Sequence, residues 1–386
     1  MKKFLIVSYY FPPYGPPVGY LRIYKIAKLL KDKGNDVLIF SNKGEEKIET
    51  NLGKEFNVIW IENEPISKEI KDKFSFFKFI GWPDRRITFF FKGFKKFKNL
   101  INKYNPDYVI ITSPPFSALL FSLLVPKDKL IVDFRDIWTY NDLGLINSPI
   151  QKFLSEKFEQ YILKKAKKVI VLNKKAKEYL EKRYKTKNIY VLPHFWDSSI
   201  KIEQNVKKAH FLRIGHFGTI YKIQGLEKVF KSISPLFGKL NFKIYLYGFA
   251  TDGTINEIIK FPFVEYKGKI SFEKINDVEV DVFLVCLDRI KGYELISKNK
   301  SKELLVFKKP MLAIIPRDNV MYEEFLEIEN IYLADIDDSN EIIEVFSKLY
   351  NDWENDRLLI PKNIEKYKDT NVFEKFYKEL FSPLYK

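Results

Sequence analysis

The six residues DFRDIW at 133–138 place two carboxylates and a guanidinium close together. They come at the end of KLIVDF at 129–134, an apolar run with the length of a buried strand. Side chains just past the carboxyl end of such a strand are the ones that an open α/β sheet exposes to ligands. Arg135 can hold a phosphate or carboxylate with its planar fork, and Asp136 can order a hydroxyl group or act as a base. The alternative is an Asp–Arg pair that only locks the loop, with Trp138 packed beneath it.

A second unusual corner is the stretch YYFPPYGPPVGYLR at 9–22, which joins a strand-like run to an amphipathic one. Proline fixes φ at about −65° and restricts the residue before it, so paired prolines make a stiff, extended ledge. Glycines let the backbone turn and let a ligand come close. The helix that follows offers free N–H groups and the positive end of its dipole. We therefore expect loop 11–19 to form a rigid rim of a ligand cleft, with a simple strand-to-helix turn as the alternative.

The composition bounds the kind of protein. At about 150 residues per domain, 386 residues predict two domains or slightly more. The formal charge of +16 favours anionic partners, namely nucleic acid, phosphorylated small molecules or an acidic lipid surface. Cys286 is the single cysteine, which excludes an intrachain disulfide and fits a reducing compartment. The apolar runs at 1–8 and 116–126 are shorter than the roughly 20 residues that span a bilayer, so we expect a soluble protein or one on a membrane surface.

Strand-like apolar runs alternate with amphipathic runs, which predicts βαβ units and parallel sheets. In the first half these runs lie at 4–8, 36–41, 57–62, 107–113, 129–134, 168–173 and 189–193, and in the second half at 211–218, 242–248, 280–287 and 310–316. The end of the chain, from Ser339 to Tyr385, has the pattern of helix throughout. We therefore predict two doubly wound Rossmann-like domains, at 1–197 and 211–368. A linker at 198–210 joins them, and a helix at 369–386 packs back on the first domain.

The segment 72–104 interleaves aromatic residues with lysines and arginines. This composition fits a helix that lies in a membrane interface. It also fits a strip that stacks and pairs with single-stranded nucleic acid. The third alternative is an ordinary helix whose aromatic side packs on the sheet while its lysines face water. The chain carries no recognisable nucleic-acid-binding module, so we do not expect nucleic acid as a partner.

An ordered set of motifs resembles the family 4 glycosyltransferases of the GT-B fold, in particular bacterial polysaccharide-biosynthesis members with an RD-x-W motif. The motifs are the FPP ledge with Gly19 and Arg22, WPD at 82–84, SPPFS at 113–117, DFRDIW at 133–138, VIVLNKKAKEYL at 169–180, FGTIY at 217–221 and NKSKELLVFKKPMLA at 299–313. The set spans nearly the whole chain and is far more specific than any one member. The resemblance implies an α/β protein of two Rossmann-like domains that face a cleft, with C-terminal helices.

The resemblance also implies a reaction. Members transfer a sugar from a nucleotide-sugar donor to a hydroxyl acceptor, retain the anomeric configuration and need no bound metal. The sequence is consistent with this, because it has no DxD-like pair on an expected loop and no His/Cys cluster with ligand spacing. Cations and backbone dipoles then have to meet the charge of the leaving group. Acceptors in bacterial members are often lipid-linked saccharides, so we expect a cytoplasmic enzyme without cofactor that can contact the inner face of an anionic membrane through 72–104.

Site residues follow by matching the motifs. Arg135, Asp136 and Lys222 are expected to be catalytic, Gly218, Thr219, Arg289, Glu294, Lys300 and Glu303 to bind the donor, and Tyr14, Gly19 and Arg22 to line the cleft loop. Glu303 matches the family glutamate that accepts hydrogen bonds from ribose hydroxyls, and Lys300 matches the lysine before it. Their spacing of three residues puts both on one helical face, so a plain salt bridge is the alternative. The family often has a second glutamate at the place of Leu295, and Glu294 stands one residue away.

The diphosphate clamp of the family is where this chain departs most. Thr219 and Gln224 stand where many members carry the arginine and lysine that grip the leaving diphosphate. Lys222 and Arg289 are therefore the expected substitutes. Two alternatives remain open at this point: a sugar-nucleotide epimerase of the same fold, and a degenerate homologue that binds a glycan without transferring a sugar.

Overall fold

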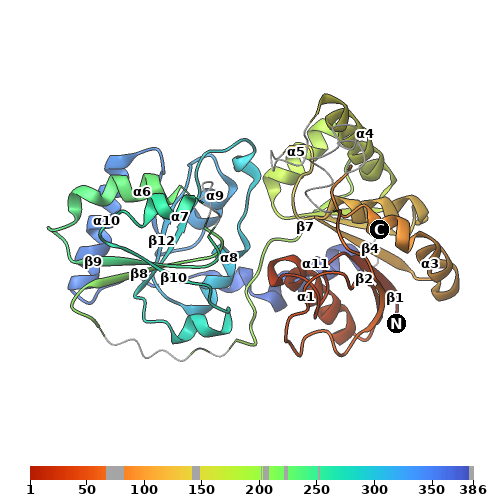
Figure 1. Cartoon of the computed structure of the whole chain (residues 1–386), viewed down its shortest axis with the longest axis horizontal. Coiled ribbons are helices and arrows are strands. Elements are labelled where there is room, and N and C mark those ends of the chain that lie inside the picture. Colours follow the sequence, from red (N-terminus) through yellow and green to blue (C-terminus); the bar gives the residue numbers. More distant parts are fainter. Residues whose placement is uncertain are drawn as a thin grey trace. The chain divides into compact units, whose positions relative to one another are not determined.

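The protein is described from a computed structural model that covers residues 1–66, 82–140, 148–200, 202, 208–220, 225–250 and 253–381 (Figure 1). The chain forms two compact units. Unit 1 consists of Met1–Pro193 and Phe373–Lys386, and unit 2 of His194–Val372. The last helix, α11 (Asp369–Phe381), therefore contributes most of its length to unit 1.

Unit 1 is built on a seven-stranded parallel sheet. Its strands are β1 (Lys3–Ser8), β2 (Asp36–Asn42), β3 (Asn57–Ile61), β4 (Tyr108–Ser113), β5 (Leu130–Phe134), β6 (Lys168–Val171) and β7 (Ile189–Val191). Their order in the sheet is β3-β2-β1-β4-β5-β6-β7, so the direction of strand addition reverses between β1 and β4. The strand interiors are apolar runs with no exposed surface, as in Phe4 to Val7, because helices cover both faces of a parallel sheet. The seven predicted strands of this half are confirmed.

The helices of unit 1 start where the sequence supplies helix-starting residues. They are α1 (Pro17–Asp32), α3 (Thr88–Tyr104), the 3-10 helix η2 (Phe116–Leu124), α4 (Pro149–Lys165) and α5 (Lys174–Tyr184). Pro17 and Pro149 stand in the first turn of α1 and α4, where the fixed φ of proline suits a helix and no N–H is needed. The side chain of Asn173 caps α5 by accepting a hydrogen bond from the Ala176 N–H at 2.8 Å.

Unit 2 holds a six-stranded parallel sheet with the order β10-β9-β8-β11-β12-β13. Its strands are β8 (Leu212–Phe217), β9 (Phe242–Tyr247), β10 (Val264–Gly268), β11 (Val282–Cys286), β12 (Met311–Ile314) and β13 (Tyr332–Ala334). The two edge strands, β10 and β13, were not predicted. β10 carries charged side chains among its five residues, and β13 has only three residues, so neither gives an apolar run that periodicity can detect.

The helices of unit 2 cover both faces of this sheet. They are α6 (Leu226–Ile233), α7 (Thr254–Ile258), α8 (Asn299–Glu303), α9 (Val320–Leu326) and α10 (Ser339–Glu354), with the 3-10 turns η4 (Ser234–Leu236), η5 (Glu273–Asp277), η6 (Tyr293–Leu295), η7 (Leu304–Phe307) and η8 (Ile364–Tyr367). Phe230 of α6 and Phe346 of α10 belong to one buried cluster, whereas Phe307 of η7 and Phe325 of α9 belong to another. Both units are thus doubly wound α/β domains, as predicted.

The prediction that the chain is helical throughout from Ser339 to Tyr385 is wrong for the residues between α10 and α11. Helix α10 ends at Glu354, and α11 begins only at Asp369. Between them Asp356 and Asn363 adopt positive φ angles of 55° and 58°, which interrupt a right-handed helix. The apolar spacing continued across this break, but the local backbone residues stop the helix.

Helix α3 covers the described part of the basic aromatic segment. Phe89 and Phe97 are fully buried and pack against Phe40 of β2, whereas Phe91 is 67% exposed. The ordinary-helix alternative therefore describes most of α3, and residues 72–81 lie outside the described residues. Among the helices that the structure describes, none is long and apolar enough to span a bilayer.

Candidate functional site

The strand order reverses once in each unit, between β1 and β4 in unit 1 and between β8 and β11 in unit 2. The carboxyl ends of the strands at such a reversal form the crevice where open α/β sheets bind ligands. The loops that follow these four strands, together with the loop after β5, carry many of the predicted site residues. Each unit therefore carries a candidate ligand-binding region of its own.

Arg22 and Asp133 form a buried ion pair that ties helix α1 to strand β5. Nη2 of Arg22 lies 3.2 Å from Oδ1 of Asp133, and Thr112 Oγ1 donates to Oδ2 of the same carboxylate at 2.9 Å. Arg22 also donates to the carbonyls of Leu192 and Pro193, at 2.9 and 3.2 Å. Since Asp133 is 0% and Arg22 7% exposed, this arginine holds the sheet and helix together and does not face a ligand as it stands.

Arg135 joins the two loops at the strand reversal of unit 1. Its Nη1 donates to the carbonyl of Gly19 at 3.0 Å and its Nε to that of Ser113 at 3.3 Å, while Nη2 donates to the carbonyl of Pro114. Burial lowers the pKa of Arg135, and the nearby Asp133 opposes that shift. These bonds support the loop-locking interpretation for Arg135, because its fork holds the ends of two loops in place.

Asp136 is the carboxylate of the DFRDIW loop that remains available. In the part of the chain that the structure describes, its half-buried side chain forms no hydrogen bond. Burial raises the pKa of Asp136, and the charge of Arg135 opposes the rise. Trp138 is 2% exposed and stacks on Phe116, with ring centroids 5.0 Å apart. Trp138 is therefore packed beneath the loop as expected, and Asp136 lies two residues before it in the sequence.

The glycines of the proline-rich loop are explained by packing. A Cβ at Gly19 would lie 2.6 Å from the ring of Tyr10, and one at Gly15 would lie 2.3 Å from the same ring. Both distances are too short for a side chain, so these glycines allow the loop to close on Tyr10. Tyr14 lies edge-on against Trp60 with ring centroids 5.0 Å apart. Gly19 thus serves the loop by close packing and through its carbonyl, and Tyr14 packs against Trp60, which lines a neighbouring cavity.

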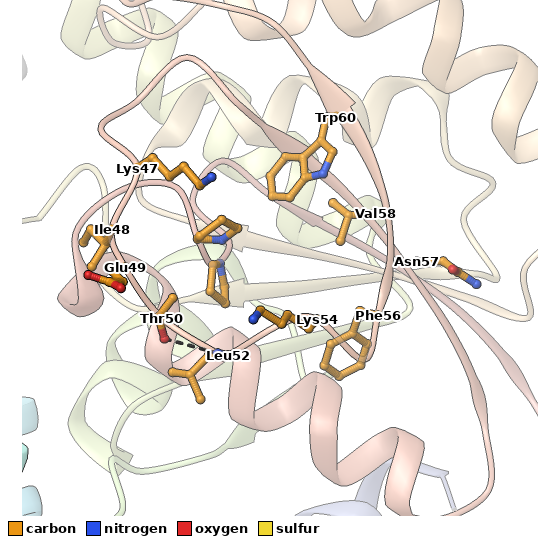
Figure 2. A pocket seen from close by; sticks show the side chains of 13 residues that line it. Lys47, Ile48, Glu49, Thr50, Leu52, Lys54, Phe56, Asn57, Val58 and Trp60 are labelled. Carbon is orange, nitrogen blue, oxygen red and sulfur yellow. Dashed lines mark hydrogen bonds between the residues drawn. The ribbon is translucent and has the colours of Figure 1, made fainter.

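That cavity has a volume of about 550 Å³ and was missed by sequence reasoning (Figure 2). It is lined by Pro12, Pro13, Lys47, Ile48, Glu49, Thr50, Leu52, Gly53, Lys54, Phe56, Asn57, Val58 and Trp60. Figure 2 shows the side chains of Lys47 and Trp60 turned toward one another. Among the described residues, neither the Lys47 ammonium nor the Glu49 carboxylate has a hydrogen-bond or ion-pair partner. An aromatic ring with a lysine turned toward it can hold a polar ligand that has an apolar face.

Three predicted donor-binding residues meet in unit 2. Gly218 follows β8, and a Cβ built on it would lie 3.9 Å from Cγ of Lys300 on α8. Nζ of Lys300 lies 2.7 Å from Oε2 of Glu303, and Asn299 Nδ2 donates to Oε1 at 2.5 Å. The helical salt bridge considered as the alternative is therefore present. The N–H of Gly218 donates to the carbonyl of Tyr247 at 2.9 Å, so this amide is already used within the sheet.

Arg289 is occupied by two carboxylates. Its Nη1 lies 2.9 Å from Oδ2 of Asp318, and its Nε contacts Asp337. These hydrogen bonds raise the pKa of Arg289. A diphosphate that approached Arg289 would also meet two negative charges, so this arginine is poorly suited to replace the clamp in this arrangement. Glu294 is half-buried on η6, next to Tyr293, whose hydroxyl contacts Asp318 and Arg289.

Lys298 is a candidate that the sequence reasoning missed. Its Nζ donates to the carbonyl of Cys286 at 2.5 Å, at the carboxyl end of β11. Burial lowers the pKa of Lys298 to about 8. Burial, with help from the charge of Lys298, lowers the pKa of His216 near the end of β8 to about 4. Lys298 thus lies at the strand reversal of unit 2, where Thr219 follows β8. The predicted catalytic Lys222 lies outside the described residues.

Comparisons with known proteins agree with this architecture. Residues 21–199 match the profile of Glycosyltransferase Family 4. Among proteins of curated function, none matches the sequence.

Solved structures resemble the whole chain. The sucrose-phosphate synthase of Thermosynechococcus elongatus has a TM-score of 0.68 at 14% identity, covering 99% of this chain and 100% of that one. A glycosyltransferase of Rickettsia africae has a TM-score of 0.64 at 16% identity, covering 98% of both chains. HepE of Anabaena, solved with UDP and glucose, has a TM-score of 0.62 at 14% identity, covering 99% and 100%. The chain therefore has the GT-B fold, which confirms the predicted fold class.

Proposed function

We propose that this protein transfers a sugar from a nucleotide-sugar donor to a hydroxyl acceptor, with retention of configuration. The observation that carries the proposal is the meeting of Gly218, Lys300 and Glu303 at the strand reversal of unit 2. A carboxylate such as Glu303 suits the vicinal hydroxyls of a ribose, and Lys300 can turn from Glu303 to a diphosphate. The UDP and glucose bound to HepE support a nucleotide sugar as the ligand class.

The proposed chemistry relies on lysines and backbone amides instead of a metal ion. Lys298 and Lys300 both lie on the segment that follows β11, and a partly buried cation acts more strongly on a diphosphate because the local dielectric is low. In this proposal Lys298 takes the place of the missing clamp. Arg289 stabilises the loop around Asp318 and does not contact the leaving group.

The acceptor is proposed to bind to unit 1. Asp136 orders the reacting hydroxyl, and its raised pKa suits a group that accepts a proton. The cavity beside Trp60 can hold a more distant sugar of the acceptor, with the indole against a sugar ring and Lys47 and Glu49 on its hydroxyls. This arrangement fits a saccharide, a lipid-linked saccharide or a polysaccharide intermediate, used on the cytoplasmic side of a membrane.

The occupied Arg289 favours one second candidate, a homologue that binds a glycan without transferring a sugar. The two candidates differ in their response to nucleotide sugars. The transferase binds them and consumes them when an acceptor is present, whereas the degenerate homologue does neither. A sugar-nucleotide epimerase would convert the donor with no acceptor at all.

A thermal-shift screen tests the donor site. We expect one of the UDP, GDP, ADP or dTDP sugars to raise the melting temperature, by the equivalent of about 2.7 kcal/mol at 100 times its dissociation constant. The shift should be the same in EDTA. Glu303→Ala should weaken this ligand by about tenfold or more, because two ribose hydroxyls lose their acceptor. The matched variant Glu344→Ala, on the exposed side of α10, should bind as wild type. If no nucleotide sugar raises the melting temperature, the donor site is wrong.

Donor affinity should fall as the pH rises through about 8, the pKa of Lys298, because the neutral amine cannot pair with a diphosphate. In the Lys298→Met variant this fall should disappear, and affinity near pH 7 should be lower by about tenfold. Calorimetric titrations on either side of pH 8 measure both effects, with the exposed Lys348→Met as the control. Without donor, Lys298 makes the free energy of unfolding rise between about pH 8 and 10.5, where the unfolded chain holds more protons. A pH profile unchanged by Lys298→Met would exclude this lysine from the site.

A further inference from the structure

Helix α4 buries three polar side chains beside the apolar Ile162 and Leu163. Gln151, Ser155 and Glu159 are 4%, 0% and 1% exposed. The Ser155 hydroxyl accepts a hydrogen bond from Nε1 of Trp82 at 3.0 Å, and Glu159 accepts from the backbone N–H and hydroxyl of Thr139, at 3.1 and 2.8 Å. These bonds tie α4 to the WPD motif and to the residue that follows DFRDIW. The polar part of the inner face holds two loops of the candidate site.

The outer face of α4 is apolar. Ile150 is 54% exposed, Phe153 57%, Leu154 39% and Tyr161 44%. With 3.6 residues per turn, these four positions fall on one side of the helix, and we call them the α4 stripe. An isolated exposed apolar residue is ordinary, but a row of four large ones on one helix marks an interaction surface.

Positive charge surrounds the α4 stripe. The exposed lysines of α4 are Lys152, Lys157 and Lys164. Lys157 lies on the same side as the stripe, with its Nζ 5.5 Å from the ring centroid of Phe153. The acidic residues of the helix do not offset these charges at the surface, because Glu156 pairs with Arg183 at 2.8 Å and Glu159 is buried. The stripe is therefore apolar and cationic at once.

We propose that the α4 stripe lies in the interface of an anionic lipid membrane. Aromatic and aliphatic side chains beside lysines are the composition of helices that lie in this interface, where the lysine stems stay apolar and their charges reach the headgroups. A protein partner is less suited, since lysine is depleted in the core of protein interfaces. This proposal rests on the proposed function, in which the acceptor is a lipid-linked saccharide at a membrane. It adds α4 to the membrane contact predicted for 72–104, where α3 buries Phe89 and Phe97 but exposes Phe91 by 67% and Phe94 by 40%.

Co-sedimentation of the full chain with lipid vesicles tests this surface. We expect binding to vesicles that contain phosphatidylglycerol, weaker binding at high salt, and little binding to pure phosphatidylcholine. A Phe153→Ser, Leu154→Ser double variant should lose affinity for the anionic vesicles by about tenfold or more. Its melting temperature should match wild type, because both side chains already face solvent.

A matched double variant of unit 2, Phe237→Ser with Leu326→Ser, removes a phenylalanine and a leucine that are 43% and 67% exposed. It should bind vesicles as wild type does. Equal losses in both double variants, or no wild-type binding to anionic vesicles, would overturn the proposal. So would a wild-type dimer in solution that the Phe153→Ser, Leu154→Ser variant converts to a monomer, since the stripe would then join two copies. Vesicle binding requires no sugar transfer, so its failure is distinguishable from failure of the donor screen.

Discussion

An Arg22→Ala variant is expected to lose about 3–5 kcal/mol of unfolding free energy, the largest stability effect that we predict. Removal of the arginine leaves the Asp133 carboxylate, which is 0% exposed, with the hydroxyl of Thr112 as its remaining side-chain hydrogen bond among the described residues. It also removes the hydrogen bonds that the carbonyls of Leu192 and Pro193 accept from Arg22. Urea denaturation measures the loss. A buried charge without its paired counter-ion is costly because water does not reach it, and the nearby Arg135 donates its hydrogen bonds to loop carbonyls.

The control for this variant is an exposed ion pair on the same helix. Lys28 and Asp32 lie 3.1 Å apart with side chains about half exposed, so Lys28→Ala should change the unfolding free energy by less than about 1 kcal/mol. If Arg22→Ala is as stable as wild type and instead loses acceptor or donor binding, Arg22 is a ligand contact. The cleft-loop role from the sequence would then be right and the structural role wrong.

An Asp136→Asn variant should slow sugar transfer by about 10²–10⁴-fold, the range for loss of a general base. Burial raises the pKa of Asp136, so its ionised form is disfavoured in the fold and the neutral amide should not destabilise the protein. The measurement is the transfer rate with the donor found in the thermal-shift screen, at saturating donor.

Two further measurements make the Asp136 experiment specific. Donor affinity should be unchanged, because the proposed donor residues lie in unit 2. The exposed Asp128→Asn variant should transfer at the wild-type rate. Wild-type transfer by Asp136→Asn would remove this carboxylate from the mechanism, and an unfolded variant would show that Asp136 is structural.

The apolar runs of the sequence were sufficient to predict most of the sheets. Strands such as β1 and β11 are buried on both faces, so Phe4 to Val7 of β1 and all of β11 form apolar runs that stand out. The edge strands β10 and β13 escaped because one is mixed with charges and the other is very short. The break after Glu354 escaped because the apolar spacing continued beyond it, whereas backbone φ at Asp356 and Asn363 decides where the helix stops.

The motifs predicted which loops carry candidate site residues but could not assign tasks to similar side chains. Arg22 and Arg135 are both arginines of matched motifs, yet one is buried in an ion pair and the other holds loop carbonyls. Arg289 pairs with Asp318 and Asp337, which are 29 and 48 residues further along the chain, and the sequence does not show that these side chains meet. Lys298 became a candidate for the donor site because folding brings its ammonium to the carbonyl of Cys286, a contact that the sequence does not show.

The direction in which a helix faces was also beyond the sequence. Periodicity shows that apolar residues share one side of a helix, and the usual inference is that this side is buried. For α3 the inference holds, with Phe89 and Phe97 inside. For α4 it fails in part, because Ser155 and Glu159 lie on the buried side with Ile162 and Leu163, while Phe153 faces water.

Hydrogen–deuterium exchange with and without the nucleotide sugar that gives the largest thermal shift tests the central claim most directly. That claim places the diphosphate and ribose against Gly218, Lys298, Lys300 and Glu303. We predict slower exchange in peptides that cover 212–220 and 298–307, and no such change in the Glu303→Ala variant at the same donor concentration. Slower exchange confined to other parts of the chain, while the donor is bound, would contradict this placement of the donor.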